Sequence, residues 1–513
     1  MKGEKGQALP LAMMALTIGS LLITPFLGHA GTSLISSRDY AGIINARNAA
    51  DAGVEHAIWR LTHGTLADQF TNPGDTVTYQ LGEVLNGFTP SITVTANATG
   101  GGGGVGGGIE DNIIDTLIFG PTGGNTPVIT PVAGNVYAIA YGDWNNYGWV
   151  KTVTVLPDGM IADTPIDTLE FDTSRCYEPD IIHVSGTTYA VVYRGQSNSG
   201  YAKTFSIAAN GDIGNSVIDS LIFDSSSCYE PDIIDVSGNY YAVAYRGQSN
   251  SGIVKTFLIA SSGNIGNSVK DSLTFDASGY EPSIEHVSGD YYAIAYRGAS
   301  NRGYLKTVGI SSGGNINNTA TDTFIFNQYS CYYPDIVNVS GGSFAISYTG
   351  ASPANGDWWG GILTTVSIAA NGNITKSITA EIVFDADDGD YADIIAVGGG
   401  IFAIAFTGGS SHGTLKTVAI NPNGTIPDGV IDTLIFENGN GFYPHVIAID
   451  ADTLAVVYTG SGGWVGILKT IGIGGGTGGM AAYQIKSTAG GLTINALVNT
   501  DNTTASIVSW QIH

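Results

Sequence analysis

The chain has 513 residues, enough for about three average domains or for one large repeat domain and a smaller one. Its 19 Lys and Arg against 44 Asp and Glu give a net charge of −25, which disfavours nucleic acid as a partner because phosphates are repelled. Only three Cys are present, which excludes a disulfide scaffold and a four-Cys zinc site. The 73 Gly, 26 Tyr and 12 % charged residues predict a mainly β protein with short strands and tight turns.

The N-terminal region carries a candidate membrane segment. Ala8–Gly28 is an uncharged apolar stretch, long enough to cross a bilayer as a helix. Lys2 and Lys5 precede it and place its start on the cytoplasmic side. A cleaved secretory signal is the alternative. Apolar residues then recur at three- to four-residue spacing, which predicts that the helix continues to about residue 63: Ile43, Ala46, Ala50, Val54, Ala57, Ile58 and Leu61.

Three adjacent features of this region form a recognisable pattern: a short basic leader ending in Gly6, the apolar stretch QALPLAMMALTIGSLLI, and the segment AADAGVEHAIWRL. The pattern resembles the N-terminus of type IV pilin-like proteins, most closely the PilX-type minor pilins. The resemblance implies cleavage after Gly6, so that Gln7 becomes the first mature residue, and a helix that packs with other pilin-like subunits. Leu11 stands where major pilins have Glu, which favours an accessory role.

A strand motif recurs seven times in the middle of the chain. YAIAY and its variants begin at Tyr137, Tyr189, Tyr241, Tyr292, Phe344, Phe402 and Leu454, at spacings of 52, 52, 51, 52, 58 and 52 residues. A second motif, IDTLIF and its variants, also occurs seven times. A period near 50 with four strand-length pieces per unit predicts a seven-bladed β-propeller. Because the first IDTLIF precedes the first YAIAY, we expect one early outer strand to close the last blade.

The predicted organisation follows from these features. It comprises a leader at 1–6, an N-terminal hydrophobic helix at 7–63, a pilin-like β-sheet head from 64–99 plus 480–513, Gly linkers at 100–108 and 474–479, and the propeller at 109–473. Neither β segment of the head has enough strands to be stable alone. We therefore expect them to combine into about five strands covering the helix, with the propeller inserted into a loop of this α+β domain.

The candidate ligand-binding face is made of the loops after the YAIAY-type strands and the loops that lead into each next blade. Exposed aromatic side chains beside Arg and acids suit a glycan or a protein ligand. The alternative is that Arg and Glu pair between neighbouring blades and that the Trp fill gaps. The candidates are Trp144, Trp149, Arg194, Arg246, Arg297, Trp358, Trp359, Trp464, Glu178, Glu230 and Glu281.

Other chemistry has weaker support in the sequence. Nucleophile-elbow, HExxH and P-loop motifs do not occur. An acidic run is the one Ca²⁺ candidate, although its spacing is not that of an EF-hand: Asp385, Asp387, Asp388 and Asp390. Cys176, Cys228 and Cys331 occupy equivalent positions in their blades, either as a Cys176–Cys228 disulfide or as buried free thiols. The repeated Tyr and the Lys-Thr pairs are predicted to be structural.

These observations predict a surface-anchored, pilin-like accessory protein in the cell envelope, with an extracellular propeller that binds a glycan or protein for adhesion. An envelope-anchored hydrolase or lyase acting on polysaccharide is the first alternative, and its only repeated acids are Glu178, Glu230, Glu281, Asp180, Asp232 and Asp335. A structural spacer is the second. Blade five carries a six-residue insertion containing Trp358 and Trp359, which we expect to contribute to binding.

Overall fold

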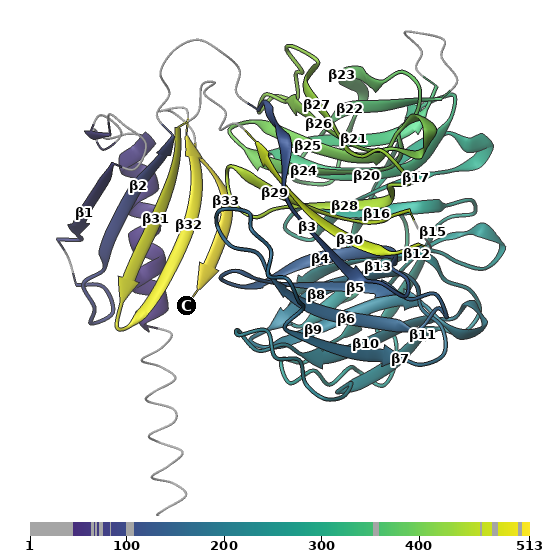
Figure 1. Ribbon diagram of the computed structural model, residues 1–513, viewed down its shortest axis with the longest axis horizontal. Helices are drawn as coiled ribbons and strands as arrows, with labels where there is room; N and C mark the ends of the chain where they lie inside the picture. The colour runs from purple at the N-terminus through teal and green to yellow at the C-terminus, as the bar shows by residue number, and fades with distance from the viewer. Residues whose placement is uncertain are drawn as a thin grey trace, which may run out of the picture. The chain divides into compact units, whose positions relative to one another are not determined.

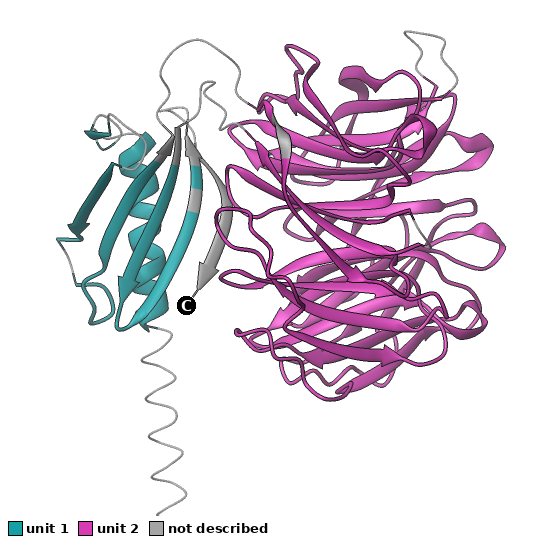
Figure 2. Cartoon of the chain, viewed as in Figure 1, with its two compact units in different colours: residues 1–99, 480–513 teal, residues 100–479 magenta. Residues whose placement is uncertain are grey.

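The chain divides into two compact units, residues 1–99 with 480–513 and residues 100–479 (Figure 2). The computed structural model describes residues 45–62, 66, 69–70, 75–82, 84–98, 107–351, 359–461, 464–473, 481–500 and 505–512. The predicted leader with Gly6 and Gln7, and the candidate membrane segment Ala8–Gly28, lie outside these ranges. Within them, no helix combines the length and the apolar character that a membrane crossing needs.

In the residues that the structure describes, the first unit consists of a helix, residues 45–62, packed on a five-stranded antiparallel sheet. The sheet order is β1-β2-β31-β32-β33, with β1 (Thr76–Gln80), β2 (Ser91–Ala98), β31 (Ala481–Ala489), β32 (Leu492–Thr500) and β33 (Ala505–Ile512). Val54, Ala57 and Leu61 recur on one helix face and are buried in the same cluster as Val94 and Ile485 of the sheet. The two short β segments, far apart in sequence, therefore share one core.

The second unit is a seven-bladed β-propeller (Figure 1). Blade one contains β4 (Asn125–Ala133), β5 (Val136–Gly142), β6 (Gly148–Thr154) and β7 (Asp167–Asp172), and blade two contains β8 (Tyr177–Ser185), β9 (Thr188–Arg194), β10 (Gly200–Ser206) and β11 (Asp219–Asp224). Blade three contains β12 (Tyr229–Ser237), β13 (Tyr240–Arg246), β14 (Gly252–Leu258) and β15 (Asp271–Asp276). Blade four contains β16 (Tyr280–Ser288), β17 (Tyr291–Arg297), β18 (Gly303–Gly309) and β19 (Asp322–Asn327).

Blades five and six are β20 (Cys331–Ser340), β21 (Ser343–Gly350), β22 (Gly360–Ile368) and β23 (Ile374–Asp385), then β24 (Asp390–Gly398), β25 (Ile401–Thr407), β26 (Gly413–Ala419) and β27 (Val430–Glu437). Blade seven joins β28 (Phe442–Ala448), β29 (Thr453–Thr459) and β30 (Gly466–Ile473) to the early strand β3 (Ile109–Gly120). This pairing confirms the predicted closure. The innermost strands contact one another in a complete circle, β4-β8-β12-β16-β20-β24-β28 and back to β4.

A threonine of the third strand links every blade to the next one. Its hydroxyl donates a hydrogen bond to the carbonyl oxygen of a glycine in the next blade. The threonine of blade seven bonds a glycine of blade one in the same way. Gly107 takes this place for blade seven, whose outer strand precedes the rest of the chain. The seven donors are Thr152, Thr204, Thr256, Thr307, Thr365, Thr417 and Thr470. The predicted structural role of the Lys-Thr pairs is therefore confirmed for Thr.

The adjacent lysine bonds the end of the preceding blade's outer strand. Lys255 Nζ donates to Asp224 Oδ2 at 2.7 Å and to the Phe223 carbonyl at 2.9 Å, and Tyr245 donates to the same carboxylate oxygen at 2.6 Å. Equivalent lysine–carboxylate pairs occur at Lys203–Asp172, Lys306–Asp276, Lys416–Asp385 and Lys469–Glu437. These pairs confirm that the lysines tie blades together.

Candidate functional site

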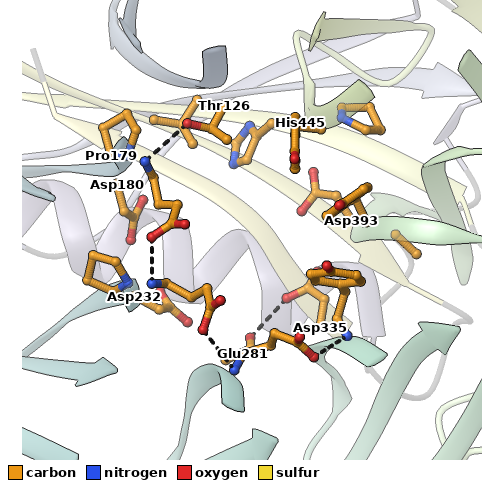
Figure 3. A pocket seen from close by; sticks show the side chains of 18 of the residues that line it. Thr126, Pro179, Asp180, Asp232, Glu281, Asp335, Asp393 and His445 are labelled. Carbon is orange, nitrogen blue, oxygen red and sulfur yellow. Dashed lines mark hydrogen bonds between the residues drawn. The ribbon is translucent and has the colours of Figure 1, made fainter. Parts of the chain in front are cut away.

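One end of the propeller, here called the upper face, contains the loops between the second and third strands of each blade and the connections between blades. The ladder pairing places Tyr177, at the start of β8, opposite Arg194, at the end of β9, so both kinds of loop lie at the same end. At the centre of this face is an open funnel of about 330 Å³. Figure 3 shows Asp180, Asp232 and Asp335 among the residues arranged around it.

The funnel is lined by one three-residue segment from each innermost strand, at the position of a β-bulge. The first residue of every segment has a positive φ of 45° to 55°, unusual for residues other than Gly: Thr126, Glu178, Glu230, Glu281, Tyr333, Tyr391 and Tyr443. Proline follows in six of the seven segments. A bulge turns side chains out of the normal alternation, so these first residues line the rim of the funnel.

Three of the rim residues are glutamates held by arginines of the same blade. Arg246 binds Glu230 through two N–H···O bonds of 3.0 and 2.9 Å, and Arg194–Glu178 and Arg297–Glu281 repeat the arrangement. Each glutamate also accepts a bond from the next blade, as when Glu230 N donates to Glu178 Oε2 at 2.9 Å. The ion pairs are therefore within blades, and the glutamates join neighbouring blades through the backbone.

The same arginines stack between tyrosines of adjacent blades. The guanidinium of Arg194 lies 4.5 Å from the Tyr177 ring centre and 4.6 Å from that of Tyr229. Arg246 lies between Tyr229 and Tyr280, and Arg297 lies between Tyr280 and Tyr332. This Arg–Tyr ladder crosses blades two to five and orients every arginine by two ring faces and one carboxylate. Arg194, Arg246 and Arg297 are thus fixed parts of the face.

A second, deeper ring is formed by the third residue of each segment, two positions further along the innermost strand. Asp180, Asp232 and Asp335 each accept a backbone N–H of a neighbouring blade through one carboxylate oxygen, as in Ile284 N to Asp232 Oδ2 at 2.7 Å. Asp393 does the same, and His445 Nδ1 accepts from Ile129 N at 3.5 Å. Burial raises the pKa of Asp335 and Asp393 to about 7. Burial lowers the pKa of His445, so the imidazole is neutral.

The funnel is chemically uneven around its circumference. Blades two to four contribute glutamates to the rim, whereas blades five to seven contribute Tyr333, Tyr391 and Tyr443. The ring centres of Tyr333 and Tyr391 are 4.1 Å apart, and those of Tyr391 and Tyr443 are 4.2 Å apart. One half of the rim is therefore ionic and the other aromatic.

The candidate tryptophans differ in exposure. Trp144, Trp359 and Trp464 are 63 %, 54 % and 49 % exposed and lie in upper-face loops of blades one, five and seven. Trp359 contacts Tyr332, the last tyrosine of the Arg–Tyr ladder, at 5.3 Å between ring centres. Trp149 was predicted to belong to the ligand-binding face, but it is half-buried on β6, and its indole N–H donates to Asp143 Oδ2. Trp358 lies outside the described residues.

Two loops with exposed tryptophans lie together at the seam between blades seven and one. Gly124 N donates to the Trp464 carbonyl at 2.8 Å, and Trp144 N donates to the Thr122 carbonyl at 3.1 Å. Gly123 has a φ of +130°, and a Cβ there would meet Trp144 N at 2.2 Å. Glycine therefore permits this close approach.

The remaining candidates have structural partners. Asp385 accepts from Lys416 Nζ at 2.9 Å and from the backbone of Asp387 and Asp388. The predicted Ca²⁺ run is thus a turn, and no group of three metal-ligating side chains occurs in the described ranges. Cys176, Cys228 and Cys331 are free and buried, which decides against the Cys176–Cys228 disulfide.

All six acids named for the enzyme alternative line the funnel. Asp393, Tyr391 and His445 were not among the site residues predicted from the sequence. Their signal was the repeat itself, because each occupies the equivalent funnel position 52 or 58 residues along the chain from its neighbours.

Comparison with known proteins finds only solved structures with a distant likeness to this chain. No family model and no curated protein matches the sequence. A structure described as a putative 6-phosphogluconolactonase from Bacteroides uniformis is 11 % identical, with a TM-score of 0.47, covering 74 % of this chain and all of that one. The Nup133 β-propeller domain of Vanderwaltozyma polyspora is 11 % identical, with a TM-score of 0.45, covering 74 % of this chain and 97 % of that one.

A third similar structure is BBS1N in complex with ARL6DN, at 8 % identity and a TM-score of 0.43, covering 71 % of this chain and 96 % of that one. At these identities a likeness concerns the fold alone.

Proposed function

We propose that this chain is a non-catalytic recognition protein whose propeller binds a glycan or protein ligand through its upper face. One observation carries the proposal. The exposed large aromatic residues of the described propeller all lie on that face: Trp144, Tyr329, Trp359 and Trp464. Exposed aromatic side chains that are already held in place give contact area at low entropic cost.

The funnel acids support a binding role rather than hydrolysis. Glu178, Glu230 and Glu281 make the same interactions in three successive blades, and the deeper aspartates repeat one backbone contact. A catalytic acid is required once, at one place, whereas interactions repeated from blade to blade hold a ring together. The hydrolase or lyase alternative remains testable in the same binding screen through release of product.

The anchoring part of the proposal rests on the N-terminal pattern and the first unit. We propose a pilin-like minor subunit or accessory protein, held in the cell envelope by its N-terminal region with the propeller outside. The helix at 45–62 packed on a five-stranded sheet is compatible with such a head domain. N-terminal sequencing of the protein from its native envelope is expected to begin at Gln7. A start at Met1, or cleavage near residue 30, would contradict the pilin-like assignment.

We expect Trp144→Ala with Trp464→Ala to weaken ligand binding at least about 30-fold, because the loss of even one aromatic side chain at a binding centre typically costs about 2 kcal/mol. The measurement is a screen of the labelled full chain against arrayed glycans and envelope proteins, followed by titration of the strongest binder. Trp359→Ala, tested separately, maps whether the footprint reaches blade five.

Trp59→Ala is the matched control, since Trp59 is 57 % exposed in the first unit. It is expected to bind like the unaltered chain. Normal binding by the Trp144/Trp464 variant would place the ligand elsewhere, and absence of any ligand would favour the spacer alternative.

A further inference from the structure

The funnel has aromatic and acidic walls but no cationic side chain of its own. Its lining contains seven carboxyl side chains, three tyrosines and His445, and neither Lys nor Arg. The nearest arginines, Arg194, Arg246 and Arg297, are each engaged by a glutamate and stacked between rings. They therefore compensate the rim glutamates and leave the deeper aspartates without a counter-charge from the lining.

A carboxyl group that is buried away from water and has no cationic partner costs free energy to ionise in a folded protein. Burial and the nearby Glu178 raise the pKa of Glu230, on the rim, to about 7 in spite of Arg246, and burial raises that of Glu285 on β16 likewise. Around the deeper ring the titratable groups are Asp180 on β8, Asp232 on β12, Glu285 on β16, Asp335 on β20, Asp393 on β24 and His445 on β28. β4 contributes Val128. A positive charge entering this ring would relieve the cost.

The shape and the walls indicate what kind of cation fits. No three of the described acidic, His or Cys side chains converge as ligands for a metal ion. The volume of about 330 Å³ is at the lower end for organic-ligand pockets. Tyr333, Tyr391 and Tyr443 form one wall, and aromatic faces attract ammonium and guanidinium groups. The prolines between the two rings suit the aliphatic part of a long side chain.

We propose that the funnel binds the positively charged side chain of a lysine or arginine presented by a protein partner. The inference rests on the proposed recognition role and narrows it from a glycan or protein ligand to a protein. The exposed tryptophans then contact the partner's surface around the inserted side chain, and the deeper aspartates supply the opposite charge.

The test is calorimetric titration of the full chain with Nα-acetyl-lysine amide and Nα-acetyl-arginine amide. Nα-acetyl-norleucine amide, which has no charge, is the neutral control. We expect the cationic amides to bind at least about tenfold more tightly than the neutral one. Binding should strengthen about tenfold from pH 6 to pH 8 and release protons, because ionised carboxylates are required. Equal affinity for the neutral amide, or binding that is independent of pH, would overturn the proposal.

Variants identify the groups responsible. Asp335→Asn with Asp393→Asn is expected to reduce binding of the cationic amides at least about tenfold. Asp163→Asn with Asp428→Asn removes the same net charge from exposed turns at the opposite end of the propeller and should leave binding unchanged. An equal loss in both variants would mean that the overall negative charge attracts the amides, which contradicts a specific funnel. Displacement of the cationic amides by Ca²⁺ bound at one ion per funnel would also contradict the proposal, because it would identify an inorganic cation as the ligand.

The two proposals can fail separately. If the Trp144/Trp464 variant loses the surface ligand while the amides show no preference for the funnel, recognition stands and the cationic side chain is wrong. If the amides bind in the funnel but the tryptophan variants retain the surface ligand, the location of the proposed binding face is wrong. Should the Asp335/Asp393 variant fail to fold, the comparison of cationic and neutral amides on the unaltered chain still decides.

Discussion

Lys255→Thr is expected to lower the free energy of unfolding of the propeller by about 3 kcal/mol. Lys255 and Asp224 form a largely buried pair with 16 % and 9 % exposed side chains. Burial opposes ionisation of Asp224, but the bonds from Lys255 and Tyr245 outweigh it and hold its pKa below the ordinary value. Removing the cation leaves that carboxylate withdrawn from water without its partner, which typically costs about 3–5 kcal/mol.

The junction between blades four and five shows how such a pair is replaced without this cost. Asn327 stands in the aspartate position and Thr364 in the lysine position. Asn327 Nδ2 donates to Tyr348 Oη at 2.9 Å, and Tyr348 Oη lies 3.3 Å from Thr364 Oγ1. Both charges have been exchanged for neutral groups, so none is left unpaired. The double variant Asp224→Asn with Lys255→Thr is therefore expected to be more stable than Lys255→Thr alone, with a coupling above about 1 kcal/mol.

Urea unfolding of the two single variants and the double variant measures this coupling. Lys376→Met is the control, because Lys376 pairs with Asp322 but its side chain is 50 % exposed. An exposed ion pair contributes at most about 1 kcal/mol. Strict additivity of the two changes at the Asp224–Lys255 junction would contradict an interdependent pair there.

The repeat made the propeller readable from the sequence. Seven copies of two strand motifs gave the number of blades, and the early position of the first IDTLIF copy gave the closure of β3 onto β30. Buried Tyr189 and Tyr193 bear out the predicted core role of the repeated tyrosines. These features could be predicted because the alternation of side chains between the two faces of a strand follows from the local sequence, and so does the position of each strand in its blade.

The site was only partly readable. The alternative in which Glu178 and Arg194 pair between blades is wrong, because the start of β8 and the end of β9 are opposite one another in one sheet. The stacking of Arg194 between Tyr177 and Tyr229 depends on how adjacent sheets are rotated, which no local pattern encodes. Asp393 was missed because its segment has Ala392 where the other six blades have Pro, and Tyr391 where blades two to four have Glu. Sequence similarity between blades thus located the funnel while leaving its contacts undetermined.

The propeller is expected to be more stable at pH 5 than at pH 8. Burial raises the pKa of four carboxyls along the innermost strands to about 7: Glu230, Glu285, Asp335 and Asp393. In the unfolded chain such groups titrate near 4. Between about pH 4 and pH 7 the folded state therefore binds more protons than the unfolded state, and stability falls as the pH rises through this window.

The carboxylates bound by lysine act in the opposite direction at lower pH. Hydrogen bonds from the lysine and tyrosine outweigh burial and hold the pKa below its ordinary value at Asp172, Asp224 and Asp276. Their contribution is complete above about pH 4 and is lost as the pH falls through their folded-state pKa. The two sets together place maximal stability near pH 4, more acidic than is usual for a globular protein.

Thermal unfolding at pH 3, 5 and 8 tests this profile. We expect the midpoint at pH 8 to lie about 5 °C or more below that at pH 5, since a domain of this size shifts by about 2 °C per kcal/mol. Asp335→Asn with Asp393→Asn should flatten the decline between pH 5 and pH 8, because two of the raised carboxyls are gone. Asp163→Asn with Asp428→Asn should retain it. A midpoint that rises from pH 5 to pH 8 would mean that the funnel carboxyls ionise in the folded protein as easily as in the unfolded chain.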